Sequence, residues 1–213
     1  MDKNVIWHKE LVGKKVVDAL QNNNFTACYV EDAATAVKFV INKIADGASV
    51  GIGGSITLNE IGLITALDKG NYKVYNHNKS GLNKEESLEI RRNELMSDVF
   101  ITSANAITLN GELVNTDGSG NRVASMTFGP RKVFIIAGIN KIVSDIPAAL
   151  ERIKNIAAPI NAKRLNRKTP CAITGKCADC SSPERICCVT TIMNKKPLSI
   201  DIEIIIVGEE LGY

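Results

Sequence analysis

The chain contains 213 residues, of which 45% are hydrophobic and 23% charged, and its formal net charge is +3. This length is sufficient to bury a sizeable core, and a mean hydropathy of +0.01 is typical of a soluble globular protein. The near balance of 26 basic and 23 acidic residues argues against a broad nucleic-acid surface. We find no secretory signal and no apolar run of the roughly eighteen residues that span a bilayer, so we expect no membrane insertion and a cytoplasmic location.

Helical and extended patterns alternate along most of the chain. In chain order they predict a helix at 8–22, a strand at 25–30, a helix at 33–45, a strand at 48–52, a helix at 58–67, a strand at 72–75, a helix at 84–96, strands at 98–102, 104–109 and 112–115, a helix at 122–127, a strand at 132–137, a helix from 147 to 155, and strands at 187–193 and 200–207. Asp32 is a suitable N-cap for the second helix, and Asn110-Gly111 is a hairpin signal.

This alternation predicts the fold class. Strands that alternate with helices favour an α/β fold with an open, mostly parallel sheet covered by helices on both faces. The hairpin and the last two strands predict an antiparallel portion. Residues 159–183 show little periodicity, so we interpret 159–190 as a cysteine-rich excursion within a single domain that spans 1–213.

Five of the six cysteines lie in one segment, residues 171–188, which we call the cysteine segment. Thiolates are soft metal ligands, and four from one loop can close a tetrahedral zinc or iron–sulfur site. The candidate ligands are Cys171, Cys177, Cys180 and Cys187, with Cys188 as the alternative fourth ligand. Cys28 stands alone in an apolar stretch and is interpreted as a core residue.

Three interpretations of the cysteine segment remain open. The first is a metal site, and the absence of a nearby histidine together with neighbouring basic side chains favours a 4Fe–4S cluster, with zinc as the alternative. The second is a set of disulfides, which a reducing cytoplasm disfavours. The third is a buried loop in which the cysteines are small apolar residues.

A glycine turn at residues 51–57 joins a predicted strand to a predicted helix. Glycines at such a turn let backbone N–H groups approach an anion, and ligands of open α/β sheets bind at the carboxyl ends of the strands. The predicted ligand-binding residues here are Gly53, Gly54, Ser55, Thr57 and Glu60. The alternative is a tight strand-to-helix turn without a ligand.

A polar loop at residues 115–122 follows the hairpin and precedes a helix, so we expect it at the edge of the sheet. Asp117 is a candidate acid or base, and Glu112 is the other candidate catalytic carboxylate. Arg122 has the fork geometry that binds a carboxylate or phosphate. The further predicted ligand-binding residues are Asn105, Gly118, Ser119 and Asn121. Each of these residue types also occurs in ordinary turns and caps.

Three long strings carry a family resemblance: GIGGSITLNEIGL at 51–63, SANAITLNGELVNTDGSGNRVASMTFGPRKV at 103–133, and TPCAITGKCADCSSPERICC at 169–188. They resemble the LUD (lactate-utilisation) family of bacterial proteins, formerly DUF162. The resemblance implies a fold similar to the NagB/RpiA/CoA-transferase group and a role in the oxidation of lactate to pyruvate alongside iron–sulfur partner subunits. It implies no established catalytic residues. The wider fold group binds sugar phosphates or CoA esters at glycine loops, which would place Gly53, Gly54, Ser55 and Thr57 at the ligand.

These observations lead to one functional hypothesis and two alternatives. The hypothesis is a redox-associated protein of the lactate-utilisation type, which binds a small anionic organic acid or phosphorylated metabolite at the glycine turn and polar loop. The cysteine segment would hold its metal or iron–sulfur centre, and the protein would be a subunit of lactate oxidation. The alternatives are an isomerase or transferase acting on a sugar phosphate or CoA ester, and a non-catalytic module that binds a metabolite.

Overall fold

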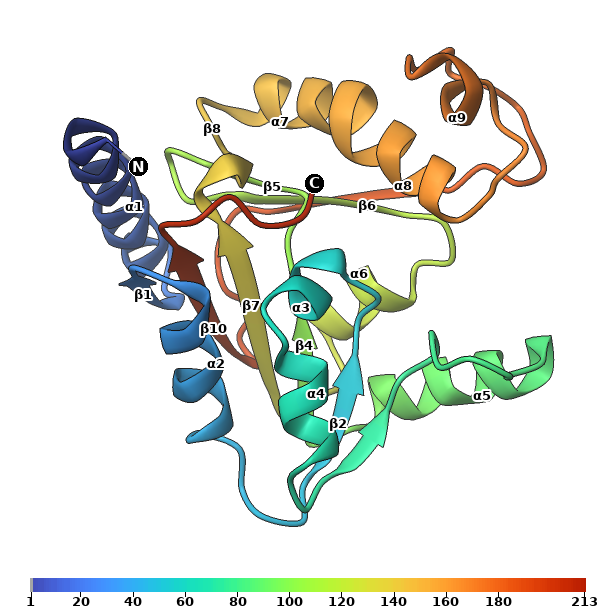
Figure 1. Ribbon diagram of the computed structural model, residues 1–213, viewed down its shortest axis with the longest axis horizontal. Coiled ribbons are helices and arrows are strands. Elements are labelled where there is room, and N and C mark those ends of the chain that lie inside the picture. Colours follow the sequence, from blue (N-terminus) through green and yellow to red (C-terminus); the bar gives the residue numbers. More distant parts are fainter. Residues whose placement is uncertain (1) are drawn as a thin grey trace.

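The computed structural model describes residues 2–213, and a six-stranded parallel sheet lies at its centre (Figure 1). The spatial order of the strands is β1-β10-β7-β4-β2-β3, and every neighbouring pair is parallel. The strand bounds are β1 (Thr26–Val30), β2 (Ser49–Ile52), β3 (Lys73–Tyr75), β4 (Val99–Thr102), β7 (Lys132–Gly138) and β10 (Asp201–Val207). The sheet is therefore open, with β1 and β3 at its edges.

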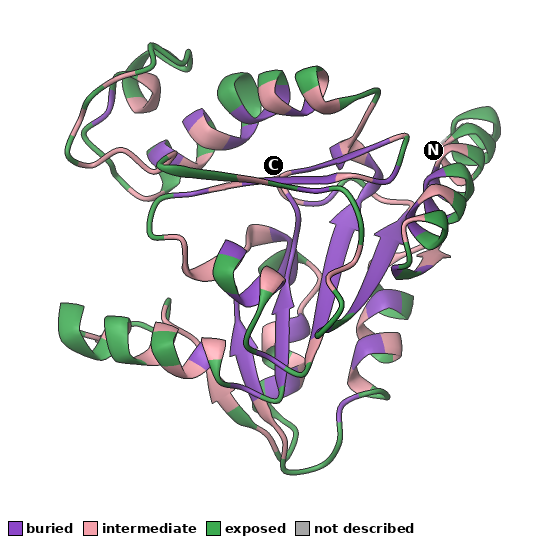
Figure 2. Ribbon diagram, turned by 180° about the vertical axis from the view of Figure 1, so that it is seen from behind, coloured by how far each residue is buried: buried purple, intermediate pink, exposed green. Residues whose placement is uncertain are grey.

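Helices cover both faces of this sheet because successive strand residues point to opposite sides. On one face, Val133 and Ile135 of β7 join a core cluster with α1 (Lys3–Asn22) and α6 (Asn121–Thr127). On the other face, Phe134 joins a second cluster with α2 (Ala33–Ile41), α3 (Ile56–Glu60) and α4 (Leu63–Asp68). Figure 2 shows the buried strands between these exposed helix surfaces. The α/β class with a helix-flanked parallel sheet is confirmed.

A second, four-stranded sheet has the order β8-β5-β6-β9. Its strands are β5 (Ala106–Thr108), β6 (Leu113–Asp117), β8 (Ile142–Val143) and β9 (Val189–Met193). One face of this sheet contacts the α1 side of the parallel sheet through Ile107 and Leu113, and the other face contacts α7 (Ile146–Arg152) through Ala106 and Val114. The helical chain continues through a π-helical turn (Ile153–Ala157) into α8 (Ala158–Arg164), above this sheet in Figure 1.

The remaining elements lie at the periphery. Helix α5 (Lys84–Leu95) projects from the β3 side of the molecule and begins with a capping box between Asn83 and Glu86. Helix α9 (Pro170–Thr174) leads into the cysteine segment, and a 3₁₀ turn (Ile139–Lys141) follows β7. No residue between 171 and 192 is buried. None of the helices within residues 2–213 combines the length and apolar character needed to cross a membrane.

Several sequence expectations need correction. The helix expected at 58–67 is divided into α3 and α4, because Gly62 adopts a left-handed conformation with φ 75° between them. The last strand, β10, was expected in an antiparallel portion but lies parallel between β1 and β7, and only β9 of the last two strands is antiparallel to its neighbour β6. The region after residue 159 was expected to be irregular but begins with α8.

Other local expectations are confirmed. The Asp32 side chain accepts a hydrogen bond from the Thr35 backbone N–H at 2.7 Å, as an N-cap does. The Asn110-Gly111 hairpin joins β5 and β6, and Gly111 has φ 82°. Cys28 is half-buried and packs against the second core cluster, and burial raises the pKa of its thiol.

Candidate functional site

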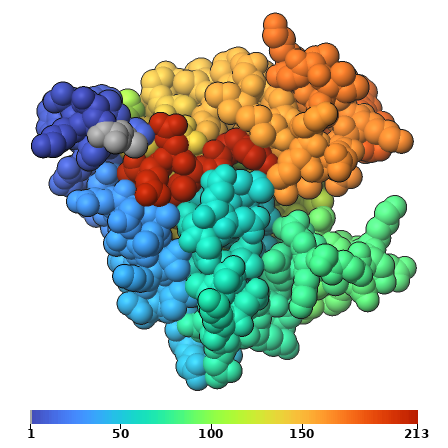
Figure 3. Space-filling view, viewed as in Figure 1, coloured from blue at the N-terminus to red at the C-terminus, as the bar shows by residue number. Residues whose placement is uncertain are grey.

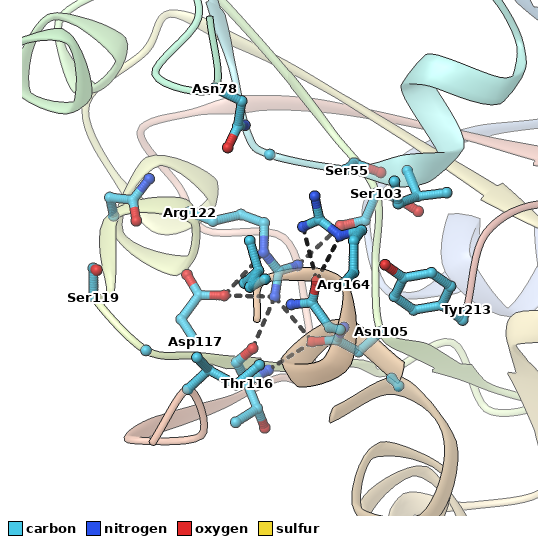
Figure 4. Close-up of a pocket in the computed structure, with 18 of the residues that line it drawn as sticks. Ser55, Asn78, Ser103, Asn105, Thr116, Asp117, Ser119, Arg122, Arg164 and Tyr213 are labelled. Atoms are coloured by element: carbon cyan, nitrogen blue, oxygen red, sulfur yellow. Dashed lines mark hydrogen bonds and ion pairs between the residues drawn. The ribbon is translucent and has the colours of Figure 1, made fainter. Parts of the chain in front are cut away.

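A cleft with a volume of about 180 Å³ lies at the carboxyl ends of the parallel strands. The chain reaches it after β2 at Gly54 and Ser55, after β3 at His77 and Asn78, and after β4 at Ser103. Helix α8 and the polar loop close the other side. Figure 4 shows Ser55, Asn78 and Ser119 around a central Arg122, with Arg164 and Tyr213 at one end. This is the edge where ligands of open α/β sheets bind.

The glycine turn forms one wall of the cleft, and it has no space for a side chain at Gly53 or Gly54. A Cβ added at Gly53 would lie 2.7 Å from the Phe100 ring, and one added at Gly54 would lie 2.6 Å from the Asn78 side-chain amide. Gly54, together with Ser55 and Thr57, lines the cleft. Glu60 points elsewhere, since its carboxylate accepts the Gly212 backbone N–H at 2.6 Å.

Arg122 connects the polar loop to the segment that follows β4. Its guanidinium donates to Asp117 at 2.6 and 2.9 Å, to the side-chain oxygens of Asn105 at 2.9 Å and Asn115 at 2.8 Å, and to the Ser103 and Thr116 carbonyls at 3.0 and 3.1 Å. Each N–H of the guanidinium thus has an acceptor within the protein. This network holds the cleft wall in place, and a ligand would have to share these donors.

The two predicted catalytic carboxylates lie apart. Asp117 lines the cleft, where its second oxygen also accepts the Val123 backbone N–H at 3.0 Å and so holds the start of α6. Glu112 lies at the hairpin, where its carboxylate accepts a hydrogen bond from the Thr108 hydroxyl. It does not line the cleft. The structure also brings the predicted Asn105, Gly118, Ser119 and Asn121 to the cleft, but not Gly53.

Lys141 is a cleft residue that sequence reasoning missed. It follows β7 in the 3₁₀ turn, is 3% exposed, and donates from Nζ to the Thr57 and Ser103 hydroxyls, each at 2.8 Å. Burial lowers the pKa of its ammonium to about 7; the positive charges of Arg152 and Arg122 add to this decrease and Glu60 opposes it. A lysine with a pKa near neutrality is unusual outside functional sites.

His77 is a second missed residue, and it is oriented by a buried carboxylate. Its Nδ1 lies 2.7 Å from Oε1 of Glu94, which is fully buried and also accepts the His77 backbone N–H at 3.2 Å. The other ring nitrogen faces the glycine turn, since a Cβ at Gly54 would lie 3.1 Å from Nε2. A histidine held in this way by a carboxylate is suited to contact a ligand through Nε2.

Positive charge dominates the cleft. Among the described residues that line it, five are arginine or lysine and one is a carboxylate: Arg91, Arg122, Lys141, Arg164 and Arg167 against Asp117. Asp117 is already paired with Arg122. The exposed Arg164 donates to the Asn161 side chain and lies at the cleft mouth beside Tyr213, whose phenol pKa is raised by burial and lowered again by Arg164. The cleft is therefore suited to a small anion.

The cysteine segment is held by Arg185, which donates to the carbonyls of Cys187 at 2.9 Å and Cys180 at 2.7 Å. All five thiols are free. Burial raises the pKa of the Cys187 thiol, Arg185 opposes this rise, and Cys177 and Cys180 add slightly to it. Within residues 2–213, no group of three or more His, Cys, Asp or Glu side chains is placed to hold a metal ion.

A comparison with models of protein families identifies the family to which this chain belongs. The model of the LUD domain matches residues 13–207, which include both sheets and the cysteine segment. The chain belongs to the LUD domain family. This family is associated with lactate utilisation, as the resemblance implied.

A solved structure gives the same result at the level of fold. The chain is similar to the crystal structure of a DUF162 family protein from Deinococcus radiodurans, with a TM-score of 0.53 and 12% sequence identity over 93% of this chain and 98% of that one. DUF162 is the older name of the LUD family. A search of curated proteins gave no match. Within this LUD domain protein, every cleft residue except Tyr213 lies inside the matched region.

Proposed function

We propose that this LUD domain protein binds a small carboxylate metabolite, such as lactate or pyruvate, in the cleft and acts in lactate utilisation. The observation that carries this proposal is the charge of the cleft: Arg122 is paired with the one lining carboxylate, whereas the lining residues Arg91, Arg164 and Arg167 form no ion pair with any described residue. Uncompensated cations near the ends of parallel strands attract an anion and gain a partner when it binds. The small volume of the cleft favours a metabolite over a macromolecule.

Calorimetric titration with lactate, pyruvate and the neutral amide lactamide tests this proposal. We expect both carboxylates to bind and lactamide not to bind, because the cations recognise the carboxylate. Arg164→Ala should weaken carboxylate binding about tenfold, the effect of one charge-assisted hydrogen bond. Arg92→Ala is the matched control, since Arg92 is exposed on α5 and pairs with Glu89 instead of lining the cleft.

Other outcomes of this titration contradict the proposal. Equal binding of lactate and lactamide would show that charge does not select the ligand. Binding of a sugar phosphate or a CoA ester in place of both carboxylates would favour an isomerase or transferase.

We propose that the single domain has the NagB/RpiA/CoA-transferase-like fold, which the helix-flanked parallel sheet and the glycine turn after β2 support.

We further propose that the cysteine segment binds an iron–sulfur cluster or a zinc ion. The supporting observations are five free thiols within residues 171–188 and the absence of any buried residue between 171 and 192. The thiol chemistry fits such a centre, although the side chains would have to converge further. The ligands would be Cys171, Cys177, Cys180 and Cys187, with Cys188 as the alternative to Cys187. An iron–sulfur cluster would supply single-electron transfer to a partner subunit, whereas zinc would stabilise the loop.

Metal analysis of protein purified without oxygen tests this second proposal. We expect bound iron with a visible absorbance band, or stoichiometric zinc in colourless protein. Cys177→Ser should abolish metal binding without unfolding the protein, because Cys177 is exposed. Cys28→Ser is the control, since Cys28 packs against the core cluster of α2. Absence of both metals, or full metal content in Cys177→Ser, would refute the assignment.

A further inference from the structure

We propose that the Lys141 amine is a nucleophile that forms an imine with the carbonyl carbon of a 2-oxo acid bound in the cleft. This inference rests on the proposed function, because it requires a small carboxylate to occupy the same site. It adds a covalent step and limits the substrate class to carboxylates with an adjacent carbonyl. The argument has three parts: the partners of Nζ, the surrounding charge, and the placement of the amine relative to the cations that would bind the carboxylate.

The partners of Nζ leave one of its bonding positions open. The Thr57 hydroxyl donates to the Leu211 carbonyl at 3.4 Å, and the Ser103 hydroxyl donates to the Ala104 carbonyl at 3.5 Å. Both hydroxyls therefore accept from Lys141 Nζ, each at 2.8 Å. A neutral amine has two N–H groups and one lone pair. When both N–H groups point to these hydroxyls, the lone pair is the position that remains for a ligand.

The charges around Lys141 favour the neutral amine. Neither of its hydrogen-bond partners in the described part of the chain is a carboxylate, and buried lysines are normally paired with one. Arg152 of α7 and Arg122 of α6 face it with positive charge, and Glu60 of α3 is the acidic group that opposes them. With a pKa of about 7, a large share of the amine carries the lone pair that nucleophilic attack requires.

The same cations favour a carboxylate beside the amine. Arg164, Arg122 and Lys141 all line the cleft. In the proposed complex, a short 2-oxo acid has its carboxylate among these cations and its carbonyl toward Nζ. In the reaction, the Nζ lone pair attacks the carbonyl carbon and forms a C–N bond. The carbonyl oxygen then leaves as water with the two protons of the amine, and a C=N bond remains. No oxidant or reductant is consumed.

Reductive trapping tests this inference. The wild-type protein is incubated at pH 7 with pyruvate and sodium cyanoborohydride, and modified lysines are identified by peptide mass spectrometry. We expect the label at Lys141 to exceed that at the exposed Lys154 by at least about tenfold, because the neutral fraction of an amine falls by a factor of ten for each unit of pKa above the ambient pH. Lactate, which has a hydroxyl in place of the carbonyl, should bind without labelling.

A variant tests whether the label requires this amine. Lys141→Arg keeps the positive charge but removes the primary amine, so peptides covering position 141 should lose the label. If the arginine is too large for this buried position, the comparison of Lys141 with Lys154 in the wild-type protein still decides the question. Pyruvate binding with no label at Lys141, or with equal labels at both lysines, would overturn the imine and leave the proposed function intact. Failure of both pyruvate and lactate to bind would overturn both.

Discussion

At the scale of single residues, the cleft contains two arrangements that use charge differently. Arg122 is a partly buried cation whose donors all have acceptors within the protein, and it fixes the wall of the cleft. Lys141 is a buried cation whose partners are two neutral hydroxyls. The first arrangement stabilises structure, whereas the second leaves a charge to be compensated by a ligand or removed by loss of a proton.

The low pKa of Lys141 predicts a particular dependence of stability on pH. The amine has a pKa of about 7 in the folded protein and an ordinary value near 10.5 in the unfolded chain. Between these values the unfolded state binds more protons, so the contribution of Lys141 to the free energy of unfolding rises with pH. Below about pH 7 the charged amine is buried and its full penalty remains. The expected slope is about 1 kcal/mol per pH unit above pH 7.

Urea denaturation of the wild-type protein and Lys141→Met from pH 6 to pH 9 measures this slope as the difference between the two proteins. We expect Lys141→Met to gain stability over the wild type at low pH and to lose this advantage as the pH rises. Lys154→Met is the control, because it replaces an exposed lysine by the same residue. Parallel curves for the wild type and Lys141→Met would contradict a depressed pKa.

The sequence predicted part of this site and not the rest. The glycine turn and the polar loop were recognisable, because glycines and polar residues that follow predicted strands collect at one edge of a parallel sheet. Lys141 had no such signal, since a single lysine after a strand has the same appearance as a surface lysine. His77 and Glu94 are 17 positions apart and come from different elements. Their pairing depends on how α5 packs against β3.

At the scale of elements, two glycines at positive φ have different surroundings. Gly62 separates α3 from α4 at φ 75°, and a Cβ there would meet nothing within 4 Å. Gly111 in the hairpin has φ 82°, and a Cβ there would lie 2.8 Å from the Ala19 backbone at the end of α1. Asn23 also donates to the Asn110 carbonyl at 2.8 Å. The hairpin turn is therefore packed directly on α1.

We expect Gly62→Ala to lower the free energy of unfolding by about 1 kcal/mol, the strain of a left-handed residue. Gly111→Ala should lower it by about 3 kcal/mol, because overpacking against a backbone is added to the same strain. Chemical denaturation of the two variants measures both values. Similar losses in the two would show that α1 moves away from the hairpin at little cost.

At the scale of the whole molecule, the order of the strands was harder to predict than their positions. Nearly continuous apolar runs in β7 and β10 identify strands that are buried on both faces, and the structure confirms their bounds to within one residue. Their neighbours are set by tertiary packing. The chain leaves the parallel sheet to form β5 and β6, returns as β7, leaves again to form β8 and β9, and returns a second time as β10 between β1 and β7. No local pattern reports that return.

The return of β10 also brings residues 208–213 to the cleft, where Figure 3 shows the C-terminal residues in red between the two layers. Asn140 holds this segment by accepting the Leu211 N–H at 3.0 Å and donating to the Gly212 carbonyl at 3.1 Å. Tyr213 then lines the cleft. Asn140 thus links the 3₁₀ turn after β7 to the cleft, and Glu60 and Thr57 of α3 also bind residues 211 and 212.

Asn140→Ala should loosen residues 211–213 while the sheets stay folded, because only the contacts of this segment with Glu60 and Thr57 remain. We expect faster amide hydrogen exchange in this segment and a several-fold loss of carboxylate affinity, because Tyr213 no longer closes the cleft. The loss of two hydrogen bonds should lower the free energy of unfolding by about 2 kcal/mol. Hydrogen exchange with mass spectrometry locates the change, and Asn71→Ala, which removes an exposed bond to Asp46, is the control. Faster exchange throughout β7 and β10 would instead show that Asn140 supports the whole sheet.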